Sequence, residues 1–326
     1  MADKEQFENS EQTEIEENEQ NERNEQNENT GNAESEQEPL LKRTRKKKHG
    51  KLWVKILIAV VVVLGLFTLI LVKQNGNLEK CFYQVKSNNV LGNIRIVCIS
   101  DMHLKEFGSH NKDLVDKIKG LEPDMITIVG DMNMENRPND YEPVIELCAQ
   151  LNIVAPLYYS LGNHEIDAML FKDSQIYNEL KEIGIKVLNN ETETINIEGT
   201  DIDVIGLTQN PKEFDQYGRK FFENAMKENP DNFKLVLTHY PENFEGILED
   251  YDIDLALAGH AHGGQVRLPW IGGLYAADQG MFPKLCDGYH EIGNSKLIIT
   301  RGLGKSGIMP RINNRPEITV VDVSWY

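Results

Sequence analysis

Cysteine is scarce in this sequence, with four residues among 326, and none has the spacing of a metal-binding pair. The cysteines therefore indicate neither a metal site nor a particular redox compartment. Cys98 and Cys148 fall inside an apparent strand and an apparent helix. We interpret them as buried free thiols.

Apolar side chains are nearly absent from the first 40 residues, which hold 14 acidic and two basic residues. Such a segment cannot bury enough surface to offset the chain entropy that folding would cost. We therefore predict a disordered acidic tail over residues 1–41.

Acidic residues are absent from residues 42–55, which contain eight lysines and arginines, and residues 56–72 carry no charge at all. The uncharged run is rich in Val, Leu and Ile, and its length approaches that needed to cross about 30 Å of hydrocarbon. Leu52–Val54 extend it if the Lys55 side chain reaches back to the interface. We predict a transmembrane helix over residues 56–72, preceded by a polybasic juxtamembrane segment over residues 42–55.

A buried core helix and a cleaved signal peptide are the other interpretations of this run. An apolar surface around the whole helix suits lipid better than a protein core. More than 50 residues precede the run, and no small-residue cleavage site follows it. An uncleaved single-pass anchor in the cell membrane is favoured. The positive-inside rule then predicts a cytoplasmic N-terminus and an extracytoplasmic C-terminal domain.

Residues 73–90 are predicted to form a linker, and residues 91–326 one globular domain. Strand patterns such as Ile94–Ile99 and Met125–Val129 alternate with helical patterns in its first part, which is typical of an α/β sheet. A strand-rich stretch with a hairpin near residues 195–207 follows, and then a second α/β stretch.

Five short polar runs follow strand patterns in this domain, and they hold five of the eight histidines of the chain. The carboxyl ends of strands in an open α/β sheet converge on one crevice, so five separate loops can meet at one site. The runs are Asp101–His103, Gly130–Asp131, Gly162–Glu165, Thr238–His239 and Gly259–His262.

Several of these runs have an ordinary structural explanation when each is taken alone. The pair at Asp131 is a common turn, Asn163 suits a helix N-cap, and His239 is a single histidine at a strand end. His260 and His262, in contrast, lie among glycines that leave room for an ion. Asp101 and His103 are two residues apart, so both side chains can grip one ion. Taken together and in order, the runs indicate ligands for two metal ions.

These blocks, DxH, GDxx, GNH[DE], H and GHxH, resemble those of the calcineurin-like metallophosphoesterase superfamily over roughly residues 91–326. The strings GHAHGGQ and RINNRPE are similar to the bacterial membrane-associated branch typified by YkuE and YaeI. The resemblance implies an α/β fold, a four-layer αββα sandwich of two mixed sheets. It also implies that one metal is held by Asp101, His103 and His262, the other by Asn163, His239 and His260, with Asp131 bridging and His164 catalytic.

The resemblance and the residues together predict a membrane-anchored dimetal phosphohydrolase that cleaves a phosphodiester, with a lipid or cell-envelope ester as one candidate. A metal-bridging hydroxide would attack phosphorus while His164 assists the leaving group. Oxygen and imidazole ligands suit Mn, Fe, Zn or Co as the two divalent ions and do not choose among them. The alternatives are a phosphomonoesterase or pyrophosphatase on the same site, and a non-enzymatic metal-binding envelope scaffold.

Other residues near the last polar run leave the substrate open. For four basic side chains, phosphate binding and solvated surface charge are both possible interpretations. For three aromatic side chains, the alternatives are a wall beside the metals and packing on the domain. After position 55 the chain has 24 basic and 38 acidic residues, so no nucleic-acid partner is expected. The oligomeric state is unknown. The cations are Arg267, Arg301, Lys305 and Arg311, and the aromatic residues are Trp270, Tyr275 and Phe282.

Overall fold

The computed structural model describes residues 49–134, 136–137, 139–305 and 310–326. The predicted acidic tail (1–41) and residues 42–48 of the predicted polybasic segment lie outside the described residues. The chain divides into two compact units, Met1–Ile58 and Ala59–Tyr326. The C-terminal part of helix α2 (His49–Gly76) therefore belongs to the same unit as the sheets.

Helix α2 contains the apolar stretch Leu52–Gly76, which is long and apolar enough to cross a membrane. The most apolar part of this stretch is not buried by the rest of the protein. The predicted apolar helix is thus present, but α2 runs past the predicted end at residue 72. Lys73, Gln74 and Asn75 are acceptable in a helix, and two of them contact the domain.

The structure differs from the predicted linker at residues 73–90. Helix α2 continues through Gly76, and strand β1 runs from Glu79 to Lys86. β1 pairs in parallel with the last strand of the chain, β16 (Glu317–Ser324). The charged residues of β1 obscure any strand pattern in its sequence. Its partner lies more than 200 residues away, so no neighbouring segment indicates the pairing.

The first sheet has the strand order β1-β16-β2-β3-β4-β5, in which β16 pairs antiparallel with β2 and the other neighbours are parallel. Its remaining strands and their helices are β2 (Ile94–Ile99), η1 (Ser109–Asn111), α3 (Lys112–Lys119), β3 (Met125–Val129), α4 (Glu142–Val154), β4 (Leu157–Ser160), α5 (Asn163–Lys172), α6 (Ile176–Glu182) and β5 (Lys186–Leu188).

The second sheet has the order β14-β15-β9-β8-β7-β6, with antiparallel pairs at both edges and parallel pairs between. The predicted hairpin is β6–β7. β10 pairs with β11, and β12 with β13, in two separate two-stranded sheets. The elements of this part of the chain are β6 (Glu191–Ile197), β7 (Thr200–Leu207), η2 (Phe214–Gly218), α7 (Arg219–Lys227), β8 (Phe233–Thr238), η3 (Pro241–Phe244), β9 (Leu255–Ala258), η4 (His262–Gly264), β10 (Arg267–Leu268), β11 (Gly272–Gly273), β12 (Tyr275–Ala276), β13 (Gly280–Met281), β14 (Gly288–Ile292) and β15 (Ser295–Ile299).

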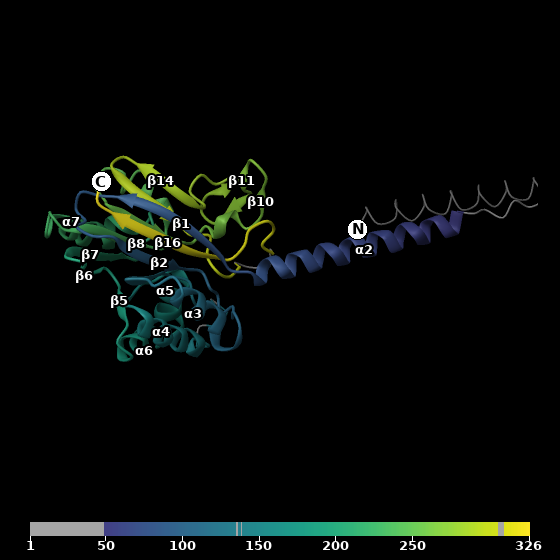
Figure 1. The fold of residues 1–326 in the computed structure, drawn as a ribbon, viewed down its shortest axis with the longest axis horizontal. Coiled ribbons are helices and arrows are strands. Elements are labelled where there is room, and N and C mark those ends of the chain that lie inside the picture. The colour runs from purple at the N-terminus through teal and green to yellow at the C-terminus, as the bar shows by residue number, and fades with distance from the viewer. Residues whose placement is uncertain (1–48, 135, 138, 306–309) are drawn as a thin grey trace, which may run out of the picture. The chain divides into compact units, whose positions relative to one another are not determined.

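Alternate residues of the central strands enter different apolar layers. In β2, Ile96 packs between the two sheets and Val97 packs toward the helices α3, α4 and α6. In β8, Leu235 faces the inter-sheet layer, whereas Val236 packs with Phe222 of α7. Figure 1 shows α3, α4, α5 and α6 grouped on one side of the sheets. The predicted four-layer sandwich of two mixed sheets is confirmed.

Candidate metal centre

The predicted site residues lie just beyond the carboxyl ends of strands from both sheets. Asp101 follows β2, Asp131 follows β3, and Asn163 begins α5 after β4, whereas His239 follows β8 and His260 follows β9. The two sheets face each other, so these loops converge.

The backbone at this site is held in an unusual conformation. Five of the seven predicted ligands have φ between 48° and 66°, in the left-handed region that residues with a Cβ seldom adopt. Such strain costs of order 1–3 kcal/mol per residue and persists where the surrounding structure over-determines it. The five residues are Asp101, His103, Asp131, His260 and His262.

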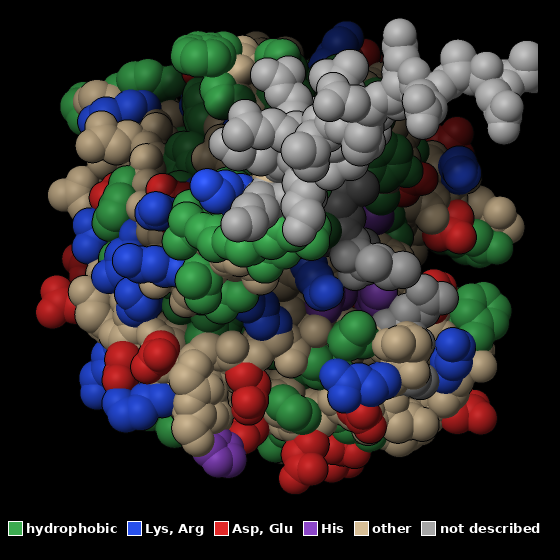
Figure 2. Space-filling view, turned by 90° about the vertical axis from the view of Figure 1, so that its right-hand side faces the viewer, with side chains coloured by type: hydrophobic (Ala, Val, Ile, Leu, Met, Phe, Trp, Pro, Cys, Tyr) green, Lys and Arg blue, Asp and Glu red, His purple; other side chains and the backbone are tan. Residues whose placement is uncertain are grey.

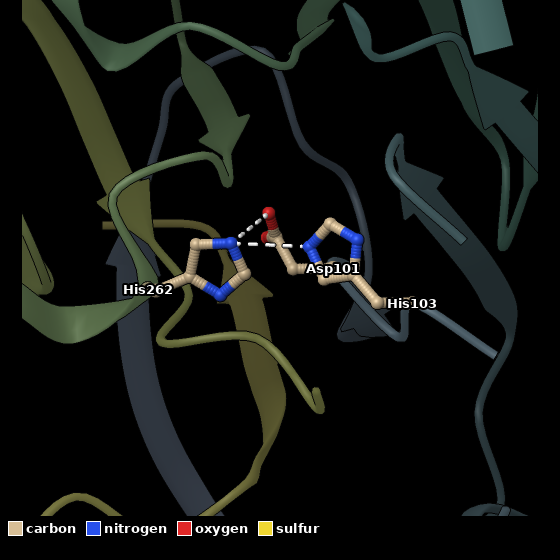
Figure 3. A group of neighbouring side chains, drawn as sticks. All are labelled: Asp101, His103 and His262. Carbon is tan, nitrogen blue, oxygen red and sulfur yellow. Dashed lines mark hydrogen bonds and ion pairs between the residues drawn. The ribbon is translucent and has the colours of Figure 1, made fainter. Parts of the chain in front are cut away.

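Asp101, His103 and His262 form the first cluster of donor atoms (Figure 3). His262 Nε2 lies 3.1 Å from His103 Nε2 and 3.4 Å from Asp101 Oδ1. Burial lowers the pKa of His103 to about 4 and that of His262 well below its usual range. Both imidazoles are therefore neutral at pH 7, and each can offer a ring nitrogen, beside the Asp101 carboxylate, to a divalent cation.

Asp131, His239 and His260 form the second cluster. His239 Nε2 lies 3.2 Å from Asp131 Oδ2 and 3.2 Å from His260 Nδ1. His239 Nδ1 donates to the Val129 carbonyl at 2.7 Å, which directs Nε2 into the cluster. Although burial opposes it, the Asp131 carboxylate raises the pKa of His239 to about 10. A metal ion held at His239 Nε2 would therefore take the place of a proton on this imidazole.

Asp131 also belongs to a third group, with His103 and His164, and so stands between the two clusters. Burial alone would raise the pKa of its carboxyl, but the imidazoles of His239, His164 and His103 hold that pKa well below the usual range. A persistent carboxylate surrounded by nitrogen donors is suited to bridging two cations.

Asn163 and His164 complete the set of predicted residues. Asn163 Oδ1 is buried without a hydrogen-bond partner among the described residues, although a buried amide oxygen normally has one. This orphaned acceptor beside His260, with which it lines one cavity, is what a metal ligand would leave. His164 Nε2 lies 3.6 Å from Asp131 Oδ2, and its ring is 4.8 Å from that of His103. The residues present therefore fit two metal ions.

Two glycines make the close approach of these loops possible. A Cβ at Gly162 would lie 2.3 Å from Asp131 Oδ1, and one at Gly259 would lie 2.6 Å from Asp101 Oδ2. The expectation that glycines in the last polar run allow close approach is confirmed at Gly259. Any larger residue at either position would push a carboxylate out of the site.

Glu165 has a role that the sequence did not reveal. Its fully buried carboxylate accepts hydrogen bonds from the backbone N–H groups of Asp131 (2.8 Å), Met132 (2.8 Å) and Gly162 (2.9 Å), and from the Tyr159 hydroxyl (3.0 Å). None of these contacts involves the ring of His164. Glu165 instead joins the start of α5 to the loop that carries Asp131.

Asp278 is a further residue that the sequence did not single out. Its Oδ2 lies 3.0 Å from His260 Nε2, opposite the nitrogen that faces His239. This contact fixes the ring so that Nδ1 points into the second cluster. Asp278 comes from the irregular segment between β12 and β13, where no local pattern indicates its position. A cavity of about 490 Å³ opens here, lined by Asn163, His260, Asp278, Glu242, Tyr240 and Lys212 among others.

The four candidate phosphate-binding cations differ in their surroundings. Arg301 pairs with Glu317 and Glu79, and Arg267 pairs with Asp287 at 2.8 Å. Lys305 is exposed. Arg311 is 1% exposed and donates to the backbone carbonyls of residues 301, 302 and 304.

The three aromatic residues of the glycine-rich loop are exposed. Trp270 is fully exposed, and Tyr275 and Phe282 are each about half exposed. Trp270 therefore does not pack on the domain, which was one of its two predicted interpretations.

Comparisons with known proteins agree with this geometry. Residues 94–264 match the family described as calcineurin-like phosphoesterase. The chain is 28% identical to the uncharacterised metallophosphoesterase YkuE of Bacillus subtilis, over 69% of this chain and 77% of that protein. It is 27% identical to the phosphodiesterase YaeI of Escherichia coli, over 70% and 82%.

A third relative carries a more specific name. The chain is 24% identical to UDP-2,3-diacylglucosamine pyrophosphatase LpxG of Chlamydia muridarum, over 66% of this chain and 79% of that protein. More than half of the chain lies within the family match, and named relatives act on phosphoesters or phosphoanhydrides. The chain therefore belongs to the calcineurin-like phosphoesterase family and is a hydrolase of phosphoesters.

Proposed function

We propose that this protein hydrolyses a phosphodiester at a centre for two divalent metal ions, and that α2 anchors it in a membrane. The observation that carries the proposal is the convergence of histidine and aspartate donor atoms within 4.8 Å of one another, beside the unpartnered Oδ1 of Asn163. The buried neutral imidazoles of His103 and His262 and the unpartnered oxygen of Asn163 are polar groups that a cation would satisfy.

In this proposal the two clusters hold one ion each. Asp101, His103 and His262 would hold the first, Asn163, His239 and His260 would hold the second, and Asp131 would contribute to both. Bound divalent ions supply an activated water and neutralise the charge of the phosphoryl oxygens. The protein side chains fix where the phosphoryl group lies, because each donor comes from a loop at the end of a buried strand.

His164 is the proposed proton donor to the leaving group. Its Nε2 faces Asp131 at 3.6 Å, and its side chain is 19% exposed, so a substrate oxygen has access to it. Its backbone N–H donates to Asp131 Oδ1 at 2.9 Å, which ties the start of α5 to the bridging carboxylate. A general acid placed in this way contributes about 10²–10⁴-fold to the rate.

The proposed substrate is an ester of the membrane or the cell envelope. An anchor formed by α2 would keep the site near lipid, and the relative LpxG is named as a pyrophosphatase of UDP-2,3-diacylglucosamine, an acylated sugar nucleotide. The same name favours a phosphoanhydride as a second candidate bond on the same site. The basic segment at residues 42–55 supports a cytoplasmic N-terminus and an extracytoplasmic domain.

His164→Ala tests this function in the full-length, detergent-solubilised protein loaded with Mn²⁺. We expect unchanged metal content by elemental analysis and a fall of about 10²–10⁴-fold in kcat/KM for bis(p-nitrophenyl) phosphate. His290→Ala is the matched control, because His290 contacts the Asp287 carbonyl outside the two clusters.

Other outcomes would count against the proposal. Equal turnover by His164→Ala and the unmodified protein would remove His164 from the chemistry. Metal binding without turnover of any diester or pyrophosphate by the unmodified protein would favour a scaffold.

A further inference from the structure

A second cavity, of about 610 Å³, lies between the end of α2 and the first metal cluster. One end of its wall is apolar and comes from α2, and the other end reaches His103, a predicted metal ligand. The lining residues used below are Leu71, Val72, Asn75, His103, Lys105 and Arg311.

The helical part of this wall is one continuous face of α2. Thr68, Leu71, Val72 and Asn75 follow the i, i+3, i+4, i+7 spacing that places side chains on the same side of a helix. Hydrogen bonds fix this face against the domain. Asn75 Nδ2 donates to the Arg311 carbonyl at 3.2 Å, and Lys105 Nζ donates to the Asn75 carbonyl at 2.6 Å. The wall is therefore built by the same helix that is apolar enough to span a membrane.

Arg311 supplies a buried cation at the metal end of this cavity. Its guanidinium is anchored by backbone carbonyls, but its Nη1 is buried without a hydrogen-bond partner among the described residues. Burial lowers the pKa of Arg311 to about 10, so the side chain is charged at neutral pH. The negative charges of Asp101 and Glu317 act on this guanidinium, and an anion in the cavity would add a further charge-assisted interaction.

Polar and apolar parts thus occupy opposite ends of one cavity. Figure 2 shows hydrophobic, Lys or Arg, and His side chains adjoining one another on this face of the molecule. A water-soluble diester would leave the apolar wall of Leu71 and Val72 without a partner. A phosphoester with a long hydrocarbon chain would cover that wall and present its phosphate to Arg311 and the metal centre.

We propose that this cavity binds the hydrocarbon chain of a membrane lipid phosphoester, with the chain along Leu71 and Val72 and the phosphate between Arg311 and the metal centre. The inference rests on the proposed function and names its substrate class. It makes α2 part of the substrate site as well as an anchor. The lipid then reaches the metals along the helix surface, without leaving the membrane completely.

Two esters that differ only in chain length test this inference. Dodecyl p-nitrophenyl phosphate and ethyl p-nitrophenyl phosphate share the phosphodiester and the leaving group. The full-length protein in phospholipid nanodiscs with Mn²⁺ is expected to show a kcat/KM for the dodecyl ester at least tenfold higher than for the ethyl ester. Burial of only a few methylene groups is enough for this factor.

Leu71→Trp narrows the cavity at its α2 wall, and Leu69→Trp is its matched control on the same helix. Leu69 is 66% exposed and does not line the cavity. Leu71→Trp is expected to lower the ratio of the two kcat/KM values at least fivefold, whereas Leu69→Trp keeps the ratio of the unmodified protein. Because all three proteins are assayed in the same nanodiscs, partitioning of the dodecyl ester into lipid cancels.

Binding gives a readout that does not depend on turnover. Dodecylphosphonate is expected to bind the metal-free, full-length protein at least fivefold more tightly than it binds the metal-free Leu71→Trp variant. The Leu69→Trp variant is expected to bind it as tightly as the unmodified protein does. Arg311→Lys is expected to weaken binding of dodecylphosphonate and ethylphosphonate by the same factor, because Arg311 acts on the phosphonate group that they share.

The outcomes separate this inference from the proposed function. Hydrolysis of neither ester would overturn the proposed function. Hydrolysis of both esters with a ratio near one, or a ratio that Leu71→Trp and Leu69→Trp change equally, would overturn the lipid cavity and leave the phosphodiesterase intact.

Discussion

Glu165→Gln is the sharpest test of how the metal centre is built. The carboxylate of Glu165 is fully buried, and every hydrogen bond recorded for it has the carboxylate as acceptor. Gln is almost the same size, but one of its two terminal groups can only donate. The substitution therefore changes hydrogen bonding with almost no change in volume.

The cost of Glu165→Gln follows from the better of two amide orientations. If the amide oxygen faces the N–H groups of Asp131 and Gly162, the NH₂ group faces those of Met132 (2.8 Å) and Asn133 (3.3 Å), while the Tyr159 hydroxyl can turn to accept. One strong and one weak charge-assisted bond are lost. At about 1.5–3 kcal/mol for a bond to a charged group, we expect a loss of about 3 kcal/mol.

Urea unfolding of the detergent-solubilised protein, followed by circular dichroism, measures this loss in the free energy of unfolding. Metal content should fall together with stability, because the displaced loop carries Asp131. Glu198→Gln, at an exposed turn, is the control and should change the free energy of unfolding by less than about 0.5 kcal/mol. A loss below about 1 kcal/mol for Glu165→Gln would refute the proposed role of Glu165 in holding the site together.

Three further predictions concern Glu242, Lys234 and Asp278. Burial raises the pKa of Glu242 to about 7. The contribution of Glu242 to the free energy of unfolding should therefore fall by about 3 kcal/mol as pH rises from 4.5 past 7, and Glu242→Gln should abolish this contribution. Lys234→Met leaves the buried Asp203 carboxylate without the Nζ that lies 2.6 Å away, and should cost about 3–5 kcal/mol in urea unfolding. Asp278→Ala frees the ring of His260 and should weaken the binding of one metal ion about 10–100-fold in calorimetric titrations.

Each of these predictions has a result that would contradict it. If the free energy of unfolding depends on pH in the same way for Glu242→Gln and the unmodified protein, Glu242 does not titrate in this range. Arg95→Met is the control for Lys234→Met, because it breaks the partly exposed ion pair with Asp322 and should cost less than about 1 kcal/mol. An equal loss in the free energy of unfolding for Lys234→Met and Arg95→Met would refute the argument from burial. Unchanged affinity for both ions in Asp278→Ala would show that His260 needs no orienting partner.

The parts of the structure that the sequence predicted well depend on local patterns. The strands Ile94–Ile99 and Met125–Val129 have the predicted bounds, because continuous β-branched and apolar runs end at glycine or polar residues. The residues predicted as ligands come together because each follows such a strand.

The parts that the sequence did not predict depend on contacts between distant segments. β1 has no strand signal of its own, and the partners of Arg301 and Arg311 lie in other loops. Glu165 could have been recognised, because a glutamate three residues after Gly162 at a helix start is the acidic half of a capping box. Its additional bonds to the loop of Asp131 could not, since no local pattern connects residues 34 positions apart.

The pairing of β1 with β16 also sets the order in which the protein can be completed during synthesis. Glu79 lies opposite Glu317, so the strand that follows α2 has no partner until the segment Glu317–Ser324 has been made. At about 5–20 residues per second, the ribosome takes on the order of 10–50 s to cover that interval. During this time β1 exposes unpaired backbone groups beside a helix that is already complete. A chaperone would therefore bind at this edge of the first sheet during synthesis, and a premature stop before Glu317 would leave β1 without its partner.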